Sequence, residues 1–124
     1  MQDAPTPGEI LESVVRLLRE TLMPELSGRS AYLARVAANA LELVRRQIEL
    51  EPSFDGAERK RLIALLGKDG TPAELNIALC EAIESRVMDS ETPGLAEHLW
   101  ATALEKMAVD QPSYAAYKRV TGRN

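Results

Sequence analysis

Three Thr-Pro pairs punctuate the chain: "TPGE" at 6–9, "TPAE" at 71–74 and "TPGL" at 92–95. A Thr side chain can accept hydrogen bonds from the free N–H groups of a helix's first turn, and Pro, which has no N–H, suits the first helical position. In the first two pairs, Glu9 and Glu74 complete the spacing of a capping box. Convergent capping explains the pairs better than an internal duplication, because the similarity between the segments soon fades. We therefore expect a helix to start at each pair.

Apolar residues between these starts recur at steps of three and four, which is the spacing of one helix face. The predicted helices cover residues 7–23, 27–50, 57–66, 72–88 and 93–109, and a short helix follows "DQPSY". Pro52, with the segment "PSFDG", is expected to break the second helix from the third. Nowhere do β-branched or aromatic residues alternate over the length of a strand. The sequence therefore predicts an all-α fold, a single compact bundle of five to six helices.

The length of 124 residues suits one hydrophobic core. We expect a single helical domain over residues 1–124, with flexible ends at 1–5 and 121–124. The fifth helix is expected to bury the spaced residues Leu99, Ala103 and Met107, and the last helix to dock Tyr114 or Tyr117.

Charge and cysteine content narrow the classes of function. The net charge is -4, and the basic clusters are interleaved with Glu, which argues against a nucleic-acid surface. A single cysteine, Cys80, excludes an internal disulfide and a Cys-type structural zinc site. No apolar run approaches the ~20 residues that span a bilayer, and the first residues lack the pattern of an export signal. We expect a soluble cytoplasmic protein that binds neither nucleic acid nor membrane.

The segment "ARVAANALELVRRQIEL" at 34–50 carries a polar stripe. At about 100° per residue, Arg35, Asn39, Glu42 and Arg46 lie in line on a helix. The opposite arc is apolar and is expected to face the core; it comprises Leu33, Val36, Ala37, Ala40, Leu41, Val44 and Ile48. The stripe is either a solvated face, with Glu42 paired to Arg46, or a contact surface.

Apolar residues border the stripe on both sides, which favours a contact surface. Tyr32, Leu43 and Leu50 lie on one side, and Ala31 and Ala38 on the other. We therefore name as candidate partner-binding residues Tyr32, Arg35, Asn39, Glu42 and Arg46. The contact can be another helix of the chain, a second subunit or a different protein.

Residues able to carry chemistry are few. His98 is the lone histidine and lacks the Glu-x-x-His and HExxH spacings of metal-binding helices, so we expect a surface position or a role satisfied by hydrogen bonds. Cys80 lies beside the apolar stripe of the fourth helix and is expected to be a small buried side chain. The sequence predicts no catalytic residues, no metal site and no cofactor, and hence a protein that is not an enzyme.

Arg86 is placed by the same periodicity almost in line with Leu75 and Leu79. Near a helix end, such a side chain can lay its stem on apolar surface, or it can pair with an acid such as Asp89. The alternative is that Arg86 binds an anionic ligand, and we keep it as the candidate anion-binding residue.

The segment "LSGRSAYLARVAANALELVRRQIE", together with "DQPSYAAY", resembles a bacterial family of small all-helical proteins known only as a domain of unknown function. The resemblance rests on the signature Arg-Val-Ala-Ala-Asn-Ala-Leu at 35–41 and on the closing Pro-x-Tyr of Pro112 and Tyr114. It implies that such proteins are encoded beside kinases similar to aminoglycoside phosphotransferases, commonly with acyl-CoA dehydrogenases. The resemblance assigns no catalytic role to any residue.

Three functions are compatible with these features. On the resemblance, the chain would be a non-catalytic accessory subunit of a phosphotransferase-like kinase that acts in hydroxyacyl-CoA or acyl-CoA catabolism. It could instead bind an acyl-CoA in an apolar groove, with Arg86 or Arg35 meeting the phosphates. A self-associating helical protein, forming a homo-oligomer, is the third alternative.

Overall fold

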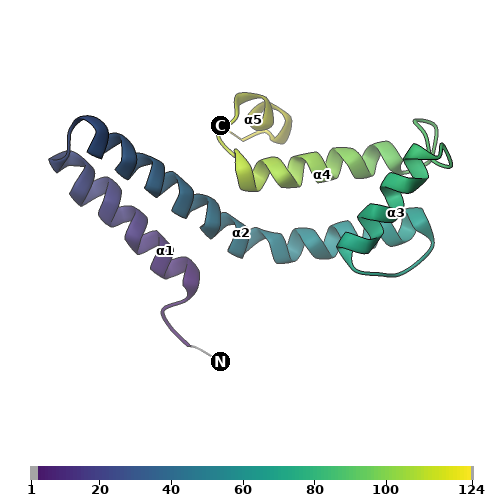
Figure 1. Cartoon of the computed structure of the whole chain (residues 1–124), viewed down its shortest axis with the longest axis horizontal. Coiled ribbons are helices and arrows are strands. Elements are labelled where there is room, and N and C mark those ends of the chain that lie inside the picture. Colours follow the sequence, from purple (N-terminus) through teal and green to yellow (C-terminus); the bar gives the residue numbers. More distant parts are fainter. Residues whose placement is uncertain (1–2, 124) are drawn as a thin grey trace. The chain divides into compact units, whose positions relative to one another are not determined.

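The computed structural model describes residues 3–123, and every regular element in that part of the chain is helical (Figure 1). The elements are α1 (Pro7–Arg16), a π-helical segment η1 (Leu17–Leu22), a 3-10 turn η2 (Met23–Glu25), α2 (Gly28–Leu66), α3 (Pro72–Glu84), α4 (Leu95–Asp110) and α5 (Ala115–Thr121). The predicted all-α class is confirmed for these residues. The expected flexibility of residues 1, 2 and 124 lies outside the described part.

The chain divides into two compact units, Met1–Glu51 and Pro52–Asn124. Each unit is described by itself below. A single bundle forming one domain over residues 1–124 stays a prediction.

Helix α2 runs through Pro52 for 39 residues, so the predicted break at "PSFDG" is wrong. A proline inside a helix removes one backbone hydrogen bond, because it has no N–H to donate to the carbonyl of Ile48. Tertiary packing holds the helix on either side of this point. Ala38 in the first unit and Leu62 in the second are both fully buried, at 0% exposure.

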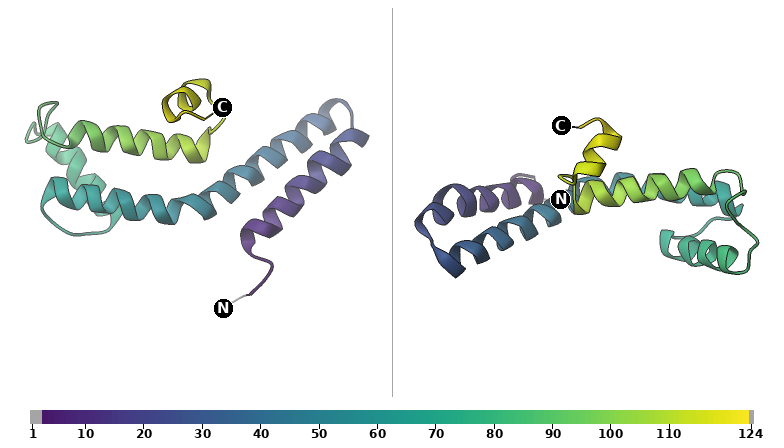
Figure 2. Two further views of the ribbon diagram at one scale, coloured as in Figure 1. Left: turned by 180° about the vertical axis from the view of Figure 1, so that it is seen from behind. Right: turned by 90° about the horizontal axis from the view of Figure 1, so that it is seen from above.

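The first unit is a helical hairpin, in which α1 and the first half of α2 lie side by side (Figure 2). The start of α1 is the predicted capping box: Glu9 N–H donates to Thr6 Oγ1 at 3.2 Å, and Thr6 N–H donates to Glu9 Oε2 at 2.7 Å. Val15 of α1 and Ala38 of α2 are the buried hydrophobic residues of this unit. The small side chain of Ala38 allows the two helices to approach closely.

The apolar arc that was expected to face the core is largely exposed, which corrects the prediction. Leu33, Val36, Val44 and Ile48 have exposed fractions of 48%, 45%, 40% and 45%. The physical reason is that α1 packs against the line through Ala38, at the edge of this arc, and not against its centre.

The second unit has its core where the end of α2, α3 and the start of α4 meet. Its buried residues are Leu62, Leu75, Leu79 and Leu95, with Ile63, Leu65, Leu66 and Met88 packed around them. Helix α3 starts with the second predicted capping box, in which Glu74 N–H donates to Thr71 Oγ1 at 3.2 Å and Thr71 N–H donates to Glu74 Oε2 at 2.9 Å. The backbone N–H of Thr71, and then its side chain, lower the pKa of the Glu74 carboxyl.

The third Thr-Pro pair does not cap a helix, contrary to prediction. Thr92 Oγ1 accepts from the backbone N–H of Asp89 at 2.9 Å, and α4 begins only at Leu95, after Gly94 with φ 87°. Because glycine adopts this left-handed conformation without a Cβ clash, it turns the chain into the helix two residues later than expected.

This turn accompanies a different buried face for α4. Leu99 is 48% exposed and Ala103 is also exposed, so their predicted burial is wrong; Met107 is half-buried. The side chains that α4 buries are Leu95, His98, Ala108 and Val109.

Helix α5 buries Tyr117, as expected for the docking of one of the two tyrosines. Within residues 3–123, no helix combines the length and apolar character needed to cross a bilayer.

Candidate functional site

The hairpin of the first unit has two different faces. In two antiparallel helices, residues one step before the contact residue point to the same flank of the pair, because both helices are right-handed. Val14 precedes the buried Val15, and Ala37 precedes the buried Ala38. The apolar residues around these positions therefore share one flank. We call this flank the apolar face; its large residues are Ile10, Val14, Leu33, Val44 and Ile48. The exposed Leu17 and Val36, two positions from a contact residue, point away from the other helix.

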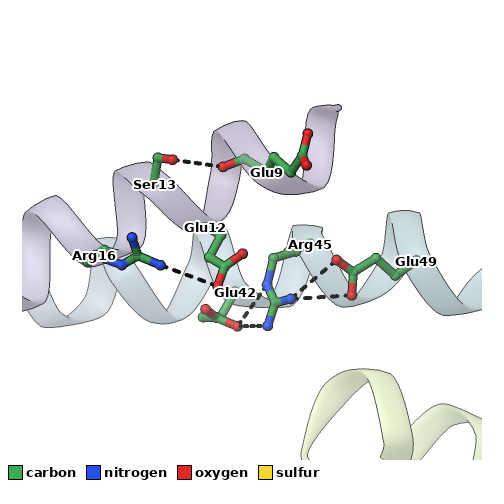
Figure 3. Close-up of polar contacts among 7 residues, drawn as sticks. All are labelled: Glu9, Glu12, Ser13, Arg16, Glu42, Arg45 and Glu49. Carbon is green, nitrogen blue, oxygen red and sulfur yellow. Dashed lines mark hydrogen bonds and ion pairs between the residues drawn. The ribbon is translucent and has the colours of Figure 1, made fainter. Parts of the chain in front are cut away.

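The opposite flank, the polar face, carries the predicted stripe. Arg19 of η1 donates from Nη2 to Asn39 Oδ1 of α2 at 3.0 Å. This hydrogen bond connects the two helices of the hairpin. Glu12 and Arg16 of α1 form an exposed ion pair on the same flank, with 3.6 Å between the charged atoms (Figure 3).

Glu42 is paired with Arg45, three residues on. Arg45 Nη2 lies 3.0 Å from Glu42 Oε2, and Arg45 Nη1 lies 3.2 Å from Glu49 Oε1 (Figure 3). The hydrogen bond to Glu42 is the main cause that raises the pKa of the Arg45 guanidinium. Arg46 is half-buried.

Tyr32 and Arg35 remain available on the surface. Tyr32 is 56% exposed, and Arg35 Cζ lies 6.0 Å from the centroid of its ring, at the limit of a cation–π contact. The structure thus separates the five predicted partner-binding residues. Asn39 and Glu42 are engaged within the hairpin and Arg46 is half-buried, whereas the exposed Tyr32 and Arg35 form a stacked pair near the start of α2.

At one end of the hairpin, the helices approach closely beside Gly8. A Cβ at this position would lie 3.0 Å from Glu49 Oε1. Glu49 also binds Arg45, so Gly8 leaves room for an ion pair of α2 under the first turn of α1.

Arg86 lies outside α3, in the turn that follows it, and is exposed with φ 61°. Its predicted alignment with Leu75 and Leu79 on one helix is wrong, because the helix ends at Glu84. The role of Arg86 in anion binding stays a prediction.

Cys80 is exposed, and its predicted burial is also wrong.

A polar cluster in the second unit was missed by sequence reasoning. Arg61 of α2 donates from Nε to His98 Nδ1 at 3.2 Å, and its Nη1 and Nη2 donate to the carboxylate of Glu105 at 2.9 and 2.8 Å. Arg61 Nη2 also lies 3.4 Å from Thr102 Oγ1. His98 is only 3% exposed, so its hydrogen-bonded role is confirmed and its surface position is not.

Burial and the charges around His98 together shift its pKa. Burial, and then the Arg61 guanidinium, lower the pKa of His98, while Glu58 and Glu105 oppose the shift. The pKa of Arg61 is raised, chiefly by its hydrogen bond with Glu105. The cluster is therefore a neutral imidazole held by a charged Arg–Glu pair, which is a structural arrangement across α2 and α4.

A shallow groove of about 160 Å³ lies between α4 and α5. Apolar side chains line it: Trp100, Ala103, Leu104, Met107, Tyr114, Ala116, Tyr117 and Val120. Neither Arg35 nor Arg86 is among them. Among residues 3–123, no three His, Cys, Asp or Glu residues are grouped so that they could hold a metal ion.

Comparison with known proteins gives one match. The family model described as "Domain of unknown function (DUF6285)" matches residues 24–114, which are 91 of the 124 residues. This range contains the exposed Tyr32–Arg35 pair and the whole of α2, α3 and α4. No curated protein and no solved structure matches the chain. Because the model covers well over half of the sequence, the chain belongs to the DUF6285 family.

Proposed function

We propose that this protein is a non-catalytic accessory subunit of a phosphotransferase-like kinase in hydroxyacyl-CoA or acyl-CoA catabolism, acting in the bacterial cytoplasm. The resemblance of "RVAANAL" and the closing Pro-x-Tyr to proteins encoded beside such kinases suggests the partner. The observation that carries the proposal is the exposed pair of Tyr32 and Arg35 on the signature helix.

Tyrosine and arginine are the residue types that dominate the energetic centres of protein interfaces. Tyr32 offers a rigid ring with a polar tip, and Arg35 holds its guanidinium over that ring at 6.0 Å. A partner that covers the pair would remove its apolar area from water and could accept hydrogen bonds from both residues. The Arg19–Asn39 hydrogen bond connects η1 to α2 one turn after Arg35, so the hairpin needs little further ordering when a partner binds.

The test is co-expression with the kinase encoded beside the gene. We expect the two proteins to co-purify and the kinase to gain solubility or turnover. Tyr32→Ala and Arg35→Ala should each weaken the complex by about 10-fold or more, as truncation of an interface anchor does. Glu12→Ala and Arg16→Ala are the matched controls, because this exposed pair lies on the same flank, and they should change affinity by less than about 3-fold.

Absence of co-purification, together with an unchanged kinase rate, would reject the proposal. Equal weakening by the control variants would also count against it, since binding would then depend on the general charge of the polar face. Circular dichroism of each variant separates a lost contact from a lost fold.

The groove between α4 and α5 favours a second candidate function, the binding of an acyl-CoA. Its wholly apolar lining, with Trp100 and Tyr117, suits the hydrocarbon part of such a ligand. Isothermal titration calorimetry with acyl-CoAs of increasing chain length would show affinity rising with length and falling in Leu104→Asp. A flat titration at high protein concentration would exclude this candidate.

A further inference from the structure

The polar cluster of the second unit holds its histidine in a contact that only a neutral imidazole can make. Nδ1 of His98 accepts a hydrogen bond from Nε of Arg61 at 3.2 Å, and His98 is 3% exposed. A protonated imidazole carries a hydrogen on both ring nitrogens, so it has no acceptor to offer and repels the guanidinium. Protonation therefore separates His98 from Arg61 and leaves its Nδ1–H in need of an acceptor.

The charged groups around His98 limit the choice of that acceptor. Arg61 and Glu58 come from α2, where they are three residues apart and share one face of the helix. Glu105 comes from α4, two turns after His98. Helix α3 contributes an uncharged group, the Asn76 amide, whose Nδ2 donates to Glu58 Oε1 at 3.1 Å. The carboxylates that act on His98 are thus Glu58 and Glu105.

These two carboxylates are held by contacts of unequal strength. Glu105 accepts from Nη1 and Nη2 of Arg61 at 2.9 and 2.8 Å, so two hydrogen bonds join two charged groups. Glu58 accepts from the neutral Asn76 amide, which also donates to the carbonyl of Pro72 at 2.9 Å. Asn76 therefore keeps an acceptor when it leaves Glu58, and Glu58 is the easier carboxylate to recruit.

We propose that this cluster is a proton-driven relay, in which protonated His98 leaves Arg61 and donates to Glu58, and Glu58 in turn releases Asn76. In the neutral state, α2 holds α4 through Arg61–His98 and α3 through Glu58–Asn76. In the protonated state, Glu58 holds α4, and α3 loses this side-chain contact. A single proton on α4 is thus felt by α3, through α2.

The relay is in its neutral state near pH 7. Burial and Arg61 lower the pKa of His98, so the imidazole takes up its proton below its ordinary pKa of about 6.5. Of the two carboxylates that oppose this shift, Glu58 has the larger effect. The electrostatics and the hydrogen bonds therefore indicate the same acceptor. All members of the relay belong to the second unit, and the relay does not depend on the accessory-subunit proposal.

The test is a pH titration of the uniformly ¹⁵N-labelled full chain by NMR, from about pH 7.5 to about pH 4.5, the range in which a histidine titrates. The ring nitrogens of His98, the lone histidine, report its protonation directly. The side-chain amide of Asn76 reports its contact with Glu58. We expect the signals of His98 and Asn76 to change with one shared midpoint.

Three variants separate the relay from a general effect of pH. His98→Asn keeps an acceptor for Arg61 but does not titrate, so the Asn76 amide should show no step at the wild-type midpoint. Glu58→Gln keeps an acceptor for Asn76 but removes the charge, and should lower the pKa of His98 by about half a pH unit or more. The matched control is Glu81→Gln, which removes an exposed acid of α3 and should leave the pKa of His98 unchanged.

An Asn76 amide that stays constant while His98 titrates overturns the relay, as does a Glu58→Gln variant with the wild-type midpoint. Loss of all dispersed signals at that midpoint also overturns it, because protonation would then unfold the unit instead of exchanging partners. Should Glu58→Gln fail to fold, the titrations of wild type and His98→Asn decide.

Discussion

Arg61 donates a hydrogen bond from Nε to Nδ1 of His98 at 3.2 Å, so the lone histidine of the chain serves as an acceptor for a charged guanidinium. An imidazole can accept at Nδ1 only while that nitrogen is unprotonated. The contact therefore links the packing of α2 on α4 to the protonation of a single side chain.

Because of this contact, the free energy of unfolding should decrease as the pH is lowered. In the unfolded chain His98 titrates near its ordinary pKa of about 6.5, whereas burial and Arg61 lower its pKa in the folded state. The unfolded state then binds more protons as the pH drops below about 6.5, so the free energy of unfolding decreases until the folded-state pKa has also been passed. Urea unfolding between pH 8 and pH 5 measures this slope.

His98→Asn is the matched variant, because its amide oxygen can accept from Arg61 but does not titrate. Its free energy of unfolding should be flatter than that of wild type between pH 7.5 and 5.5. Identical pH profiles for the two proteins would show that the histidine is not the cause.

Pro52→Ala should stabilise the protein. Proline in the interior of a helix is about 3 kcal/mol less favourable than alanine, and Pro52 is exposed, so its replacement gives up little packing. We expect an increase of about 1 to 3 kcal/mol in the free energy of unfolding, measured by chemical denaturation. Ser53→Ala, at the next exposed position, is the control and should change it by less than about 0.5 kcal/mol. If Pro52 instead ended a helix, Pro52→Ala would not increase the free energy of unfolding.

Ala38→Leu should destabilise the hairpin, because Ala38 has 0% exposure where α1 meets α2. Three additional carbon atoms at this contact must push the helices apart, at a cost of about 1 to 3 kcal/mol. Ala64→Leu makes the same change at an exposed position of α2 and should have little effect. Thermal unfolding followed by circular dichroism compares them; equal melting temperatures would mean that α1 does not pack on Ala38.

Two Gly→Ala substitutions should act in opposite directions. Gly94 has φ 87°, and a Cβ there would lie 3.3 Å from Leu65 Cδ2, so Gly94→Ala should destabilise by about 1 to 2 kcal/mol. Gly56 lies inside α2, and a Cβ added to it would meet no atom within 4 Å, so Gly56→Ala should stabilise by about 0.5 to 1 kcal/mol. Differential scanning calorimetry of the two variants measures the direction of each change in stability. If both variants changed stability in the same direction, the conformations described for Gly94 and Gly56 would be contradicted.

The helix starts at Pro7 and Pro72 could be predicted because a capping box is a local device. Thr6 and Thr71 need only the three residues that follow them. Thr92 has the same neighbour, Pro93, but the left-handed turn at Gly94 comes between it and the helix. The continuation of α2 through Pro52 could not be predicted either, because it depends on packing against residues that are distant in sequence.

The candidate site could be predicted only in part. Periodicity correctly separated an apolar arc from a polar stripe on α2, but it could not tell which edge of the arc would meet α1. The small side chains of Ala31 and Ala38, on the border of the stripe, were the available signal, because helices approach closely at such residues. The Arg61–His98 contact had no comparable signal, since it joins residues 37 apart in sequence.

The exposed thiol of Cys80 gives this protein a natural label site. As the lone cysteine, it can take a single maleimide dye per chain without any engineered substitution. A labelled chain would then report the binding of a partner protein by fluorescence anisotropy, in wild-type protein and at nanomolar concentrations.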